Sequence, residues 1–151
     1  MKWENIAEMP CSVARTLSVI GDRWTMLILR DAFSHPVRFE ALREKFGVTR
    51  HLLASRLDRL VDQGIFDRQL YQERPKRYEY RLTPKGHSLL PVLLTMIAWG
   101  DQWMDGGAGP PVVVRHRECQ HATHAVCVCA SCGGVLTSDG IETMKGPGWP
   151  G

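Results

Sequence analysis

The order of elements expected between residues 38 and 86 constrains the fold more than any other feature of this chain. A helix is expected over 39–46, because the next residue, Gly47, is of the type that most often closes a helix in the left-handed conformation. A second helix is expected over 49–63, since it opens on a threonine, whose hydroxyl caps helix N-termini, and Gly64 follows it. Two helices joined by so short a turn, with a hairpin directly after them, predict a winged helix-turn-helix.

The second of these helices has two distinct faces. Its buried stripe is formed by apolar residues at i, i+4, i+7 and i+8, namely Leu53, Leu57, Leu60 and Val61. Its opposite face is polar and cationic and carries His51, Leu52, Ser55 and Arg59, with Arg50 and Arg56 at its borders. Such an outer face is typical of a helix that enters a groove of double-stranded DNA.

The hairpin that follows forms the wing. Residues 65–71 favour one strand, and residues 77–82 alternate aromatic or apolar with charged side chains, as a half-buried second strand does. A polar turn over 72–76 is expected between them. Arg74, Lys76 and Arg77 would then project from the tip, within reach of a phosphate backbone.

Charge is unevenly distributed along the chain. Residues 38–85 hold 12 lysines and arginines against 7 aspartates and glutamates, while the remaining residues hold 7 against 9. Positive charge is therefore concentrated on the segment expected to read DNA, as phosphate binding requires. A solvated charged surface would also explain an excess this small.

Helices flank this segment on both sides. A helix from Pro10-Cys11 to Gly21 and another over 24–33 carry little charge, so we expect them to supply core. A third helix starts at Pro84 and is apolar nearly all round from 89 to 104. One small domain cannot cover every side of such a helix, which predicts a homodimer on a palindromic operator. The alternative is that the C-terminal tail folds back over it.

Many separate positions match one family in order and spacing. They are Cys11, the Ile20-Gly21-Asp22-Arg23-Trp24 corner, Leu27-Ile28-Leu29, Arg38-Phe39, Leu42, Arg56-Leu57, Leu60, Gly64, Tyr80-Arg81-Leu82-Thr83, Lys85-Gly86 and Trp99. Over residues 10–104 the chain resembles the HxlR-type transcriptional regulators. The resemblance implies a dimeric winged-helix regulator whose outer helices form the dimer. One departure is visible, because the family's corner usually reads Gly-Gly-Lys-Trp and Asp22-Arg23 stand here instead.

DNA contacts are expected from two sets of residues. Base edges would be read from the N-terminal half of the second helix by Arg50, His51, Ser55 and Arg56, since arginine grips guanine O6 and N7 with two hydrogen bonds. Phosphates would be held by Arg38, Arg59, Arg74, Lys76 and Arg77. For each arginine the alternative is an exposed residue paired with a nearby acid, such as Arg59 with Asp62.

Cys11 stands at the start of a helix, with Arg15 one turn on. Both features favour the thiolate and would raise its reactivity toward oxidants or electrophiles. Several members of the family that the chain resembles sense disulfide stress or quinones through a cysteine at the matching place. The alternative is a small residue packed at the dimer interface.

The tail carries metal-ligand spacing. Residues 105–115 form a Gly/Pro-rich linker followed by a strand expected over 112–114, and residues 116–151 hold His116-x-x-Cys119 and Cys129-x-x-Cys132-Gly133. Two such pairs are how zinc-ribbon knuckles hold Zn²⁺. His121, His124 and Cys127 compete as ligands. The alternatives are a metal-free β-hairpin extension or a disulfide from Cys119 to Cys129 or Cys132.

The expected fold is therefore mainly α with a small β-hairpin wing over residues 1–104, plus a short zinc-ribbon-like β extension. The expected function is a DNA-binding transcriptional regulator that answers a redox signal or a small-molecule inducer. A winged helix used only for protein contacts is the alternative. A metal or thiol enzyme is disfavoured, because the chain shows no nucleotide loop, nucleophile elbow or metalloprotease-like motif. The first residues lack the apolar run of a secretory signal, so a cytoplasmic protein with no membrane association is expected.

Overall fold

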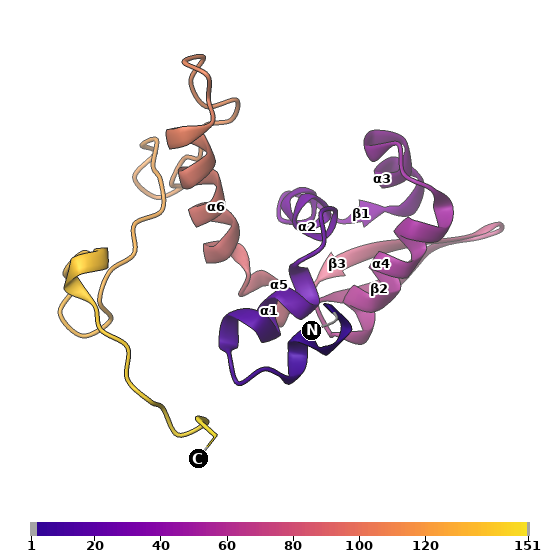
Figure 1. The fold of residues 1–151 in the computed structure, drawn as a ribbon. Coiled ribbons are helices and arrows are strands. Elements are labelled where there is room, and N and C mark those ends of the chain that lie inside the picture. Colours follow the sequence, from indigo (N-terminus) through magenta and orange to yellow (C-terminus); the bar gives the residue numbers. More distant parts are fainter. Residues whose placement is uncertain (1–2, 151) are drawn as a thin grey trace. The chain divides into compact units, whose positions relative to one another are not determined.

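The computed structural model describes residues 3–150, with side chains from residue 5 onward (Figure 1). Its elements in chain order are η1 (Trp3–Glu8), α1 (Ser12–Ile20), α2 (Thr25–Ala32), β1 (Val37–Arg38), α3 (Phe39–Phe46), α4 (Arg50–Asp62), β2 (Phe66–Glu73), β3 (Lys76–Leu82), α5 (Pro84–His87), α6 (Leu90–Trp103) and η2 (Ser138–Gly140). The chain forms two compact units, one ending at Leu90 and the other beginning at Pro91. The helix α6 thus groups with the tail, whereas we expected a boundary after residue 104.

The helix-turn-helix is α3 and α4, and its local signals are confirmed. Gly47 closes α3 with φ of 61°, a conformation that costs an L-residue energy but glycine little. Thr49 caps α4, its hydroxyl accepting a hydrogen bond from the Leu52 N–H at 3.3 Å. Both helices begin and end within a residue or two of the predicted bounds.

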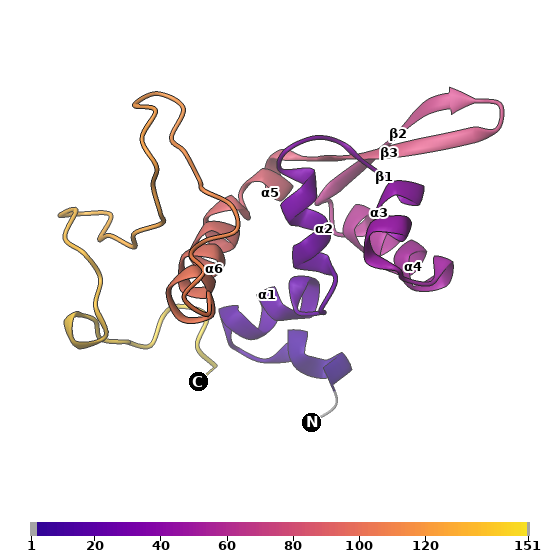
Figure 2. The same ribbon diagram turned by 90° about the horizontal axis from the view of Figure 1, so that it is seen from above.

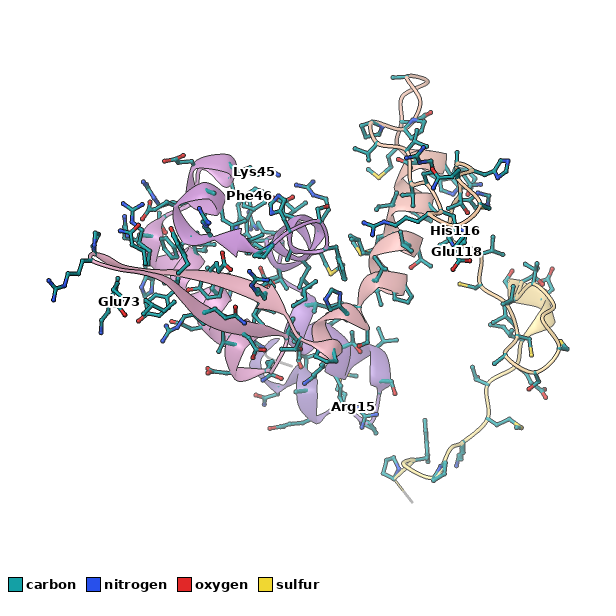
Figure 3. The ribbon with its side chains drawn as sticks, turned by 180° about the vertical axis from the view of Figure 1, so that it is seen from behind. Arg15, Lys45, Phe46, Glu73, His116 and Glu118 are labelled. Carbon is teal, nitrogen blue, oxygen red and sulfur yellow. The ribbon has the colours of Figure 1, made fainter. Side chains whose placement is uncertain are left out.

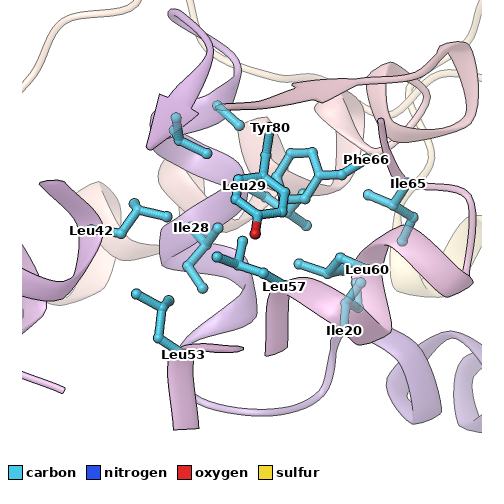
Figure 4. Close-up of a cluster of buried hydrophobic side chains, with 12 residues drawn as sticks. Ile20, Ile28, Leu29, Leu42, Leu53, Leu57, Leu60, Ile65, Phe66 and Tyr80 are labelled. Atoms are coloured by element: carbon cyan, nitrogen blue, oxygen red, sulfur yellow. The ribbon is translucent and has the colours of Figure 1, made fainter. Parts of the chain in front are cut away.

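One apolar core holds the N-terminal unit together (Figure 4). The α4 stripe supplies Leu53, Leu57 and Leu60, each at most 1% exposed. They pack against α2 and the sheet through residues that include Ile28, Leu29, Phe66 and Tyr80. Burial of this stripe leaves only the opposite face of α4 free to meet a ligand.

Three antiparallel strands form the sheet, in the order β1-β3-β2. The β2–β3 hairpin extends past the helices as the predicted wing (Figure 2). Its turn is tighter than the one expected over 72–76, because Glu73 pairs with Lys76 and only residues 74 and 75 lie between the strands. A register shift between Leu70 and Gln72 leaves Tyr71 out of the ladder.

Asp22 organises the corner ahead of α2. Its Oδ1 accepts hydrogen bonds from the N–H groups of Trp24 at 2.9 Å and Thr25 at 3.1 Å, and Oδ2 accepts one from the Thr25 hydroxyl. The residue that departs from the family's usual corner therefore caps α2 in this chain.

The N-terminal helix α1 corrects one expectation. Ile20 is buried, but Val13 is 66% and Leu17 39% exposed, so α1 supplies less of the core than expected. The short helix η1 before it was not predicted, because its residues carry no helical periodicity.

The expected helix after the wing is two helices. Pro84 opens α5 as predicted, and Thr83 caps it through its hydroxyl. A break at Ser88 and Leu89 precedes α6, and Pro91 explains it, since proline has no N–H with which to continue the hydrogen-bond ladder to His87.

The C-terminal unit has little regular structure beyond α6. The strand expected over 112–114 is absent from the described residues, and two isolated bridges, Arg115–Ala122 and Val128–Val135, stand in this region instead. None of residues 115–150 is buried, so this stretch builds no core of its own. No helix in residues 3–150 is long and apolar enough to span a bilayer.

Candidate nucleic-acid interface

The N-terminal half of α4 presents Arg50, His51 and Ser55, and all three are exposed. The side chain of Arg50 is 69% exposed, and its Nη2 lies 2.7 Å from Glu40 Oε1 on α3. Its guanidinium also lies 5.4 Å from the ring centroid of Phe39. Arg50 is thus held at the start of α4 by α3, at the position where recognition helices contact base edges.

Glu40 is the acid that holds it. A hydrogen bond from Arg43, aided by the positive charge of Arg50, keeps the pKa of the Glu40 carboxyl below its ordinary value. Glu40 therefore remains an anion at neutral pH and occupies the guanidinium of Arg50.

Arg56 occupies a different position from the one expected. Its side chain is 28% exposed, and Nε lies 3.3 Å from Asp22 Oδ1 without forming a hydrogen bond to any atom of residues 5–150. The structure thus places Arg56 against the corner ahead of α2 and not on the outer face with Arg50. Its expected base contact stays a prediction that this geometry does not favour.

Arg59, expected on phosphate, is also engaged within the protein. Its Nη2 donates a hydrogen bond to the Ser18 carbonyl of α1. The predicted alternative, a pair with Asp62, is absent among the ion pairs of the described residues. Arg59 therefore links α4 to α1 through one of its five N–H donors, and its expected phosphate contact stays a prediction.

Arg38 lies between the wing and α3. Its guanidinium stacks 4.2 Å from the Tyr71 ring centroid, and its Nη2 lies 3.8 Å from Glu79 Oε2. Glu79 is only 9% exposed and also accepts a hydrogen bond from Arg81 Nη2 at 2.7 Å. Sequence reasoning missed this buried acid, because strand alternation placed Glu79 among solvated residues.

The wing carries exposed cationic side chains. Arg74, Lys76 and Arg77 are exposed and have no ion-pair partner within the part of the chain that the structure describes. Figure 3 shows the neighbouring Glu73 at the narrow end of the hairpin. Arg68 on β2, which we did not predict, lies 4.7 Å from the Tyr78 ring centroid and is also exposed. Burial does not alternate along β2, so strand periodicity gave no signal for Arg68.

Cys11 is half-buried at the N-cap position of α1. The guanidinium of Arg15 donates a hydrogen bond to Ser12 Oγ at 3.1 Å. The reactivity expected of Cys11 stays a prediction.

The predicted metal ligands lie in two turns of the C-terminal unit. His116 Nδ1 lies 3.3 Å from Cys119 Sγ in the first turn. In the second, hydrogen bonds from the backbone N–H groups of Cys132 and Ser131 lower the pKa of the Cys129 thiol. Within residues 3–150, no three His, Cys, Asp or Glu side chains lie together as a metal site. Each predicted pair of ligands lies in one turn, but in the described chain the two pairs do not meet.

A groove of about 1020 Å³ runs beside α6 in the same unit. Its walls come from α6, with Leu94, Ile97 and Trp99, and from residues 110–127. The tail thus lies along one side of α6, as the alternative to a dimer predicted. It leaves Trp99 60% and Trp103 67% exposed, so much of the apolar surface of α6 is uncovered.

Comparison with known proteins agrees with this geometry. An HxlR-like helix-turn-helix family model matches residues 19–107. An uncharacterised HTH-type transcriptional regulator of Mycobacterium bovis is 40% identical over 138 residues, 91% of this chain and 87% of that protein. The crystal structure of PA1607, a candidate transcription factor, superposes with a TM-score of 0.81 at 33% identity and covers 93% of this chain and 98% of its own. The redox regulator HypR in its reduced form gives a TM-score of 0.58 at 32% identity, covering 61% of this chain and 92% of its own.

Proposed function

The chain belongs to the HxlR-like helix-turn-helix family of transcriptional regulators, and we propose that it binds a specific operator in double-stranded DNA as a homodimer. One observation carries the proposal. The outer face of α4 and the tip of the wing both carry exposed cationic side chains, while the opposite face of α4 is buried in the core.

In this proposal α4 enters the major groove. Arg50, His51 and Ser55 face base edges, and Arg50 supplies the bidentate contact that best discriminates a guanine. The wing cations Arg74, Lys76 and Arg77 contact phosphates, as does Arg38 at the base of the wing. These contacts set register but carry no sequence preference.

The dimer is supported by the apolar surfaces of both outer helices. Met96, Trp99 and Trp103 of α6 are each more than half exposed, as is Val13 of α1. Large apolar side chains so exposed mark an interaction surface. A second copy of the chain is the partner that also supplies the two-fold symmetry of a palindromic operator.

A redox response is the regulatory proposal that a specific comparison favours. HypR, which is 32% identical to this chain in a superposition that covers 61% of it, is a redox regulator. Cys11 is the only cysteine of the N-terminal unit and is partly accessible. We propose that its oxidation weakens operator binding. Full retention of the oxidant response by Cys11→Ser would contradict this role and point to the tail cysteines. Operator binding by the wild type that ignores oxidant would instead point to a small-molecule inducer, for which the groove beside α6 is the candidate site.

The operator proposal is tested by footprinting the reduced full chain on DNA from upstream of its own gene. Arg50→Ala should weaken the protected site by about 5- to 100-fold, the range of one bidentate base contact, and relax its sequence preference. Arg43→Ala is the matched control, because Arg43 also binds Glu40 but lies on α3. Equal losses from both variants, or no protected site, would overturn the proposal. A winged helix used only for protein contacts would give the latter result.

A further inference from the structure

Two segments of the C-terminal unit, residues 114–123 and 127–136, have the same backbone hydrogen bonds. The outermost bond of the first joins the Thr123 N–H to the Val114 carbonyl at 2.8 Å, and that of the second joins Leu136 to Cys127 at 2.9 Å. An isolated antiparallel bridge lies next inside each, Arg115–Ala122 in the first and Val128–Val135 in the second.

The inner bonds repeat as well. The His116 N–H donates to the His121 carbonyl at 3.0 Å, and Cys129 donates to Gly134 at 2.8 Å. His116 and Cys129 also each accept a backbone hydrogen bond, and it is 2.8 Å long in both segments. The Gln120 N–H donates to the His116 carbonyl, and the Gly133 N–H donates to the Cys129 carbonyl. Every partner in the second segment is 13 positions after its counterpart, as Cys129 is after His116.

Side-chain similarity does not produce this repeat. Aligned at that offset, the two ten-residue segments share a single residue type, the cysteine at Cys119 and Cys132. The residue after that cysteine is left-handed in both segments, Gln120 with φ of 62° and Gly133 with φ of 72°. Gln120 is the only non-glycine residue with positive φ in the described chain, and residues that carry a Cβ seldom adopt this conformation. The same turn is therefore formed twice, once against the preference of its sequence.

Each turn presents two metal-binding side chains separated by two residues. The bond lengths of tetrahedral zinc, about 2.0–2.1 Å to nitrogen and 2.3 Å to sulfur, place two such ligands about 3.6 Å apart. His116 Nδ1 and Cys119 Sγ are 3.3 Å apart. The first turn thus already has nearly the ligand separation that the ion needs.

The repeat also selects among the competing ligands. Cys127 corresponds to Val114, His121 to Gly134 and His124 to Thr137, so all three lie outside the paired ligand positions. We propose that His116, Cys119, Cys129 and Cys132 bind one zinc ion, which joins the two turns. Three thiolates and an imidazole favour zinc over harder cations, and four protein ligands make the site structural.

The ion would supply what this stretch lacks. Residues 115–150 bury no side chain, and a segment without a core gains its stability from a bound metal or a crosslink. Metal binding would draw the two pairs together, since each turn holds only half of a tetrahedral set.

The test is the metal content of the full chain, purified under reducing conditions and saturated with zinc before gel filtration. We expect one zinc per chain, falling to about one tenth or less in Cys119→Ser and Cys132→Ser, because a three-ligand site holds zinc far more weakly. His116→Ala should lower the zinc content as well. Cys127→Ser and His121→Ala are matched controls that should retain full occupancy, and limited proteolysis should cut the tail faster in the depleted variants only.

Two results would overturn the site. One is wild-type protein that holds no zinc, and the other is loss of zinc from Cys127→Ser with retention in His116→Ala. Operator binding by the N-terminal unit is measured separately, so failure of either proposal is distinguishable from failure of the other.

Discussion

Arg50, which we propose contacts DNA, is held in place by contacts within the protein. Glu40 and the Phe39 ring fix it at the start of α4. Because the Arg43 hydrogen bond lowers the pKa of Glu40, the carboxylate keeps its charge below the ordinary pKa of a glutamate and loses it only as the pH falls through the lowered value. If Arg50 contacts DNA as proposed, the DNA must displace an anionic carboxylate at neutral pH.

Glu40→Gln tests this competition. The variant removes a negative charge beside the DNA surface and frees Arg50, so affinity for DNA of any sequence should rise by about 3- to 10-fold at low salt. The gain should shrink as salt screens the charge. Fluorescence anisotropy with specific and scrambled duplexes measures it. Glu44→Gln on the same helix, which lacks the contact with Arg50, is the control, and an equal gain there would contradict the competition.

Leu57 provides the corresponding test for the core. It has no exposed surface and lies in the middle of the α4 stripe. Leu57→Ala should lower the free energy of unfolding by about 2–5 kcal/mol, because the transfer term and the cavity add. Leu70→Ala, at a leucine that is 45% exposed, should cost much less. Urea titration measures the free energy of unfolding of each variant. Similar losses in both would mean that the stripe is not the core.

At the scale of elements, α5 depends on close approach to Ile65, the residue directly ahead of β2. A Cβ on Gly86 would lie 2.4 Å from the Ile65 carbonyl oxygen and 2.8 Å from Leu82 Cδ2. Gly86→Ala should therefore destabilise the unit by about 1–3 kcal/mol, since the backbone of Ile65 has to move. Exposed Ser88→Ala, two residues on, should change stability by less than about 0.5 kcal/mol. A neutral Gly86→Ala in thermal unfolding would show that this contact is not required.

Elements with local signals were predictable, and contacts between distant elements were not. Gly47, Thr49 and Pro84 placed helix ends from the sequence, because each acts on its own backbone. Arg56 and Arg59 were assigned to DNA from their position on α4, whereas their partners Asp22 and Ser18 come from other elements. The periodicity of apolar residues within one helix does not indicate a contact with another element.

The wing shows the same limit. Both of its strands were expected, the second from its alternation, but the shorter turn depends on the pairing of Glu73 with Lys76. The burial of Glu79 depends on Arg38 and Arg81, and Arg38 reaches it because β1 pairs with β3. That pairing joins residues some 40 positions apart and left no signal in either segment.

At the scale of the whole molecule, the proposed dimer makes a prediction about mass. Trp99→Asp with Trp103→Asp would place charges on the exposed apolar surface of α6 and should shift the protein from dimer to monomer in sedimentation velocity. Circular dichroism should show a folded N-terminal unit. His124→Asp, a charge change in the tail, is the control. A monomeric wild type, or a double variant that stays dimeric, would contradict a dimer formed through α6.

The salt dependence of binding tests the central claim most directly, that α4 and the wing read a specific operator. Reduced full chain would be titrated on its own upstream DNA and on a scrambled duplex between about 50 and 200 mM salt. We predict tighter binding to the upstream sequence by about 10³-fold or more, a steep fall of affinity with salt, and a slope about one unit shallower in Lys76→Ala. Lys145→Ala, a charge removed from the tail, should leave the slope unchanged. Equal affinity for both duplexes, or binding that ignores salt, would contradict the account.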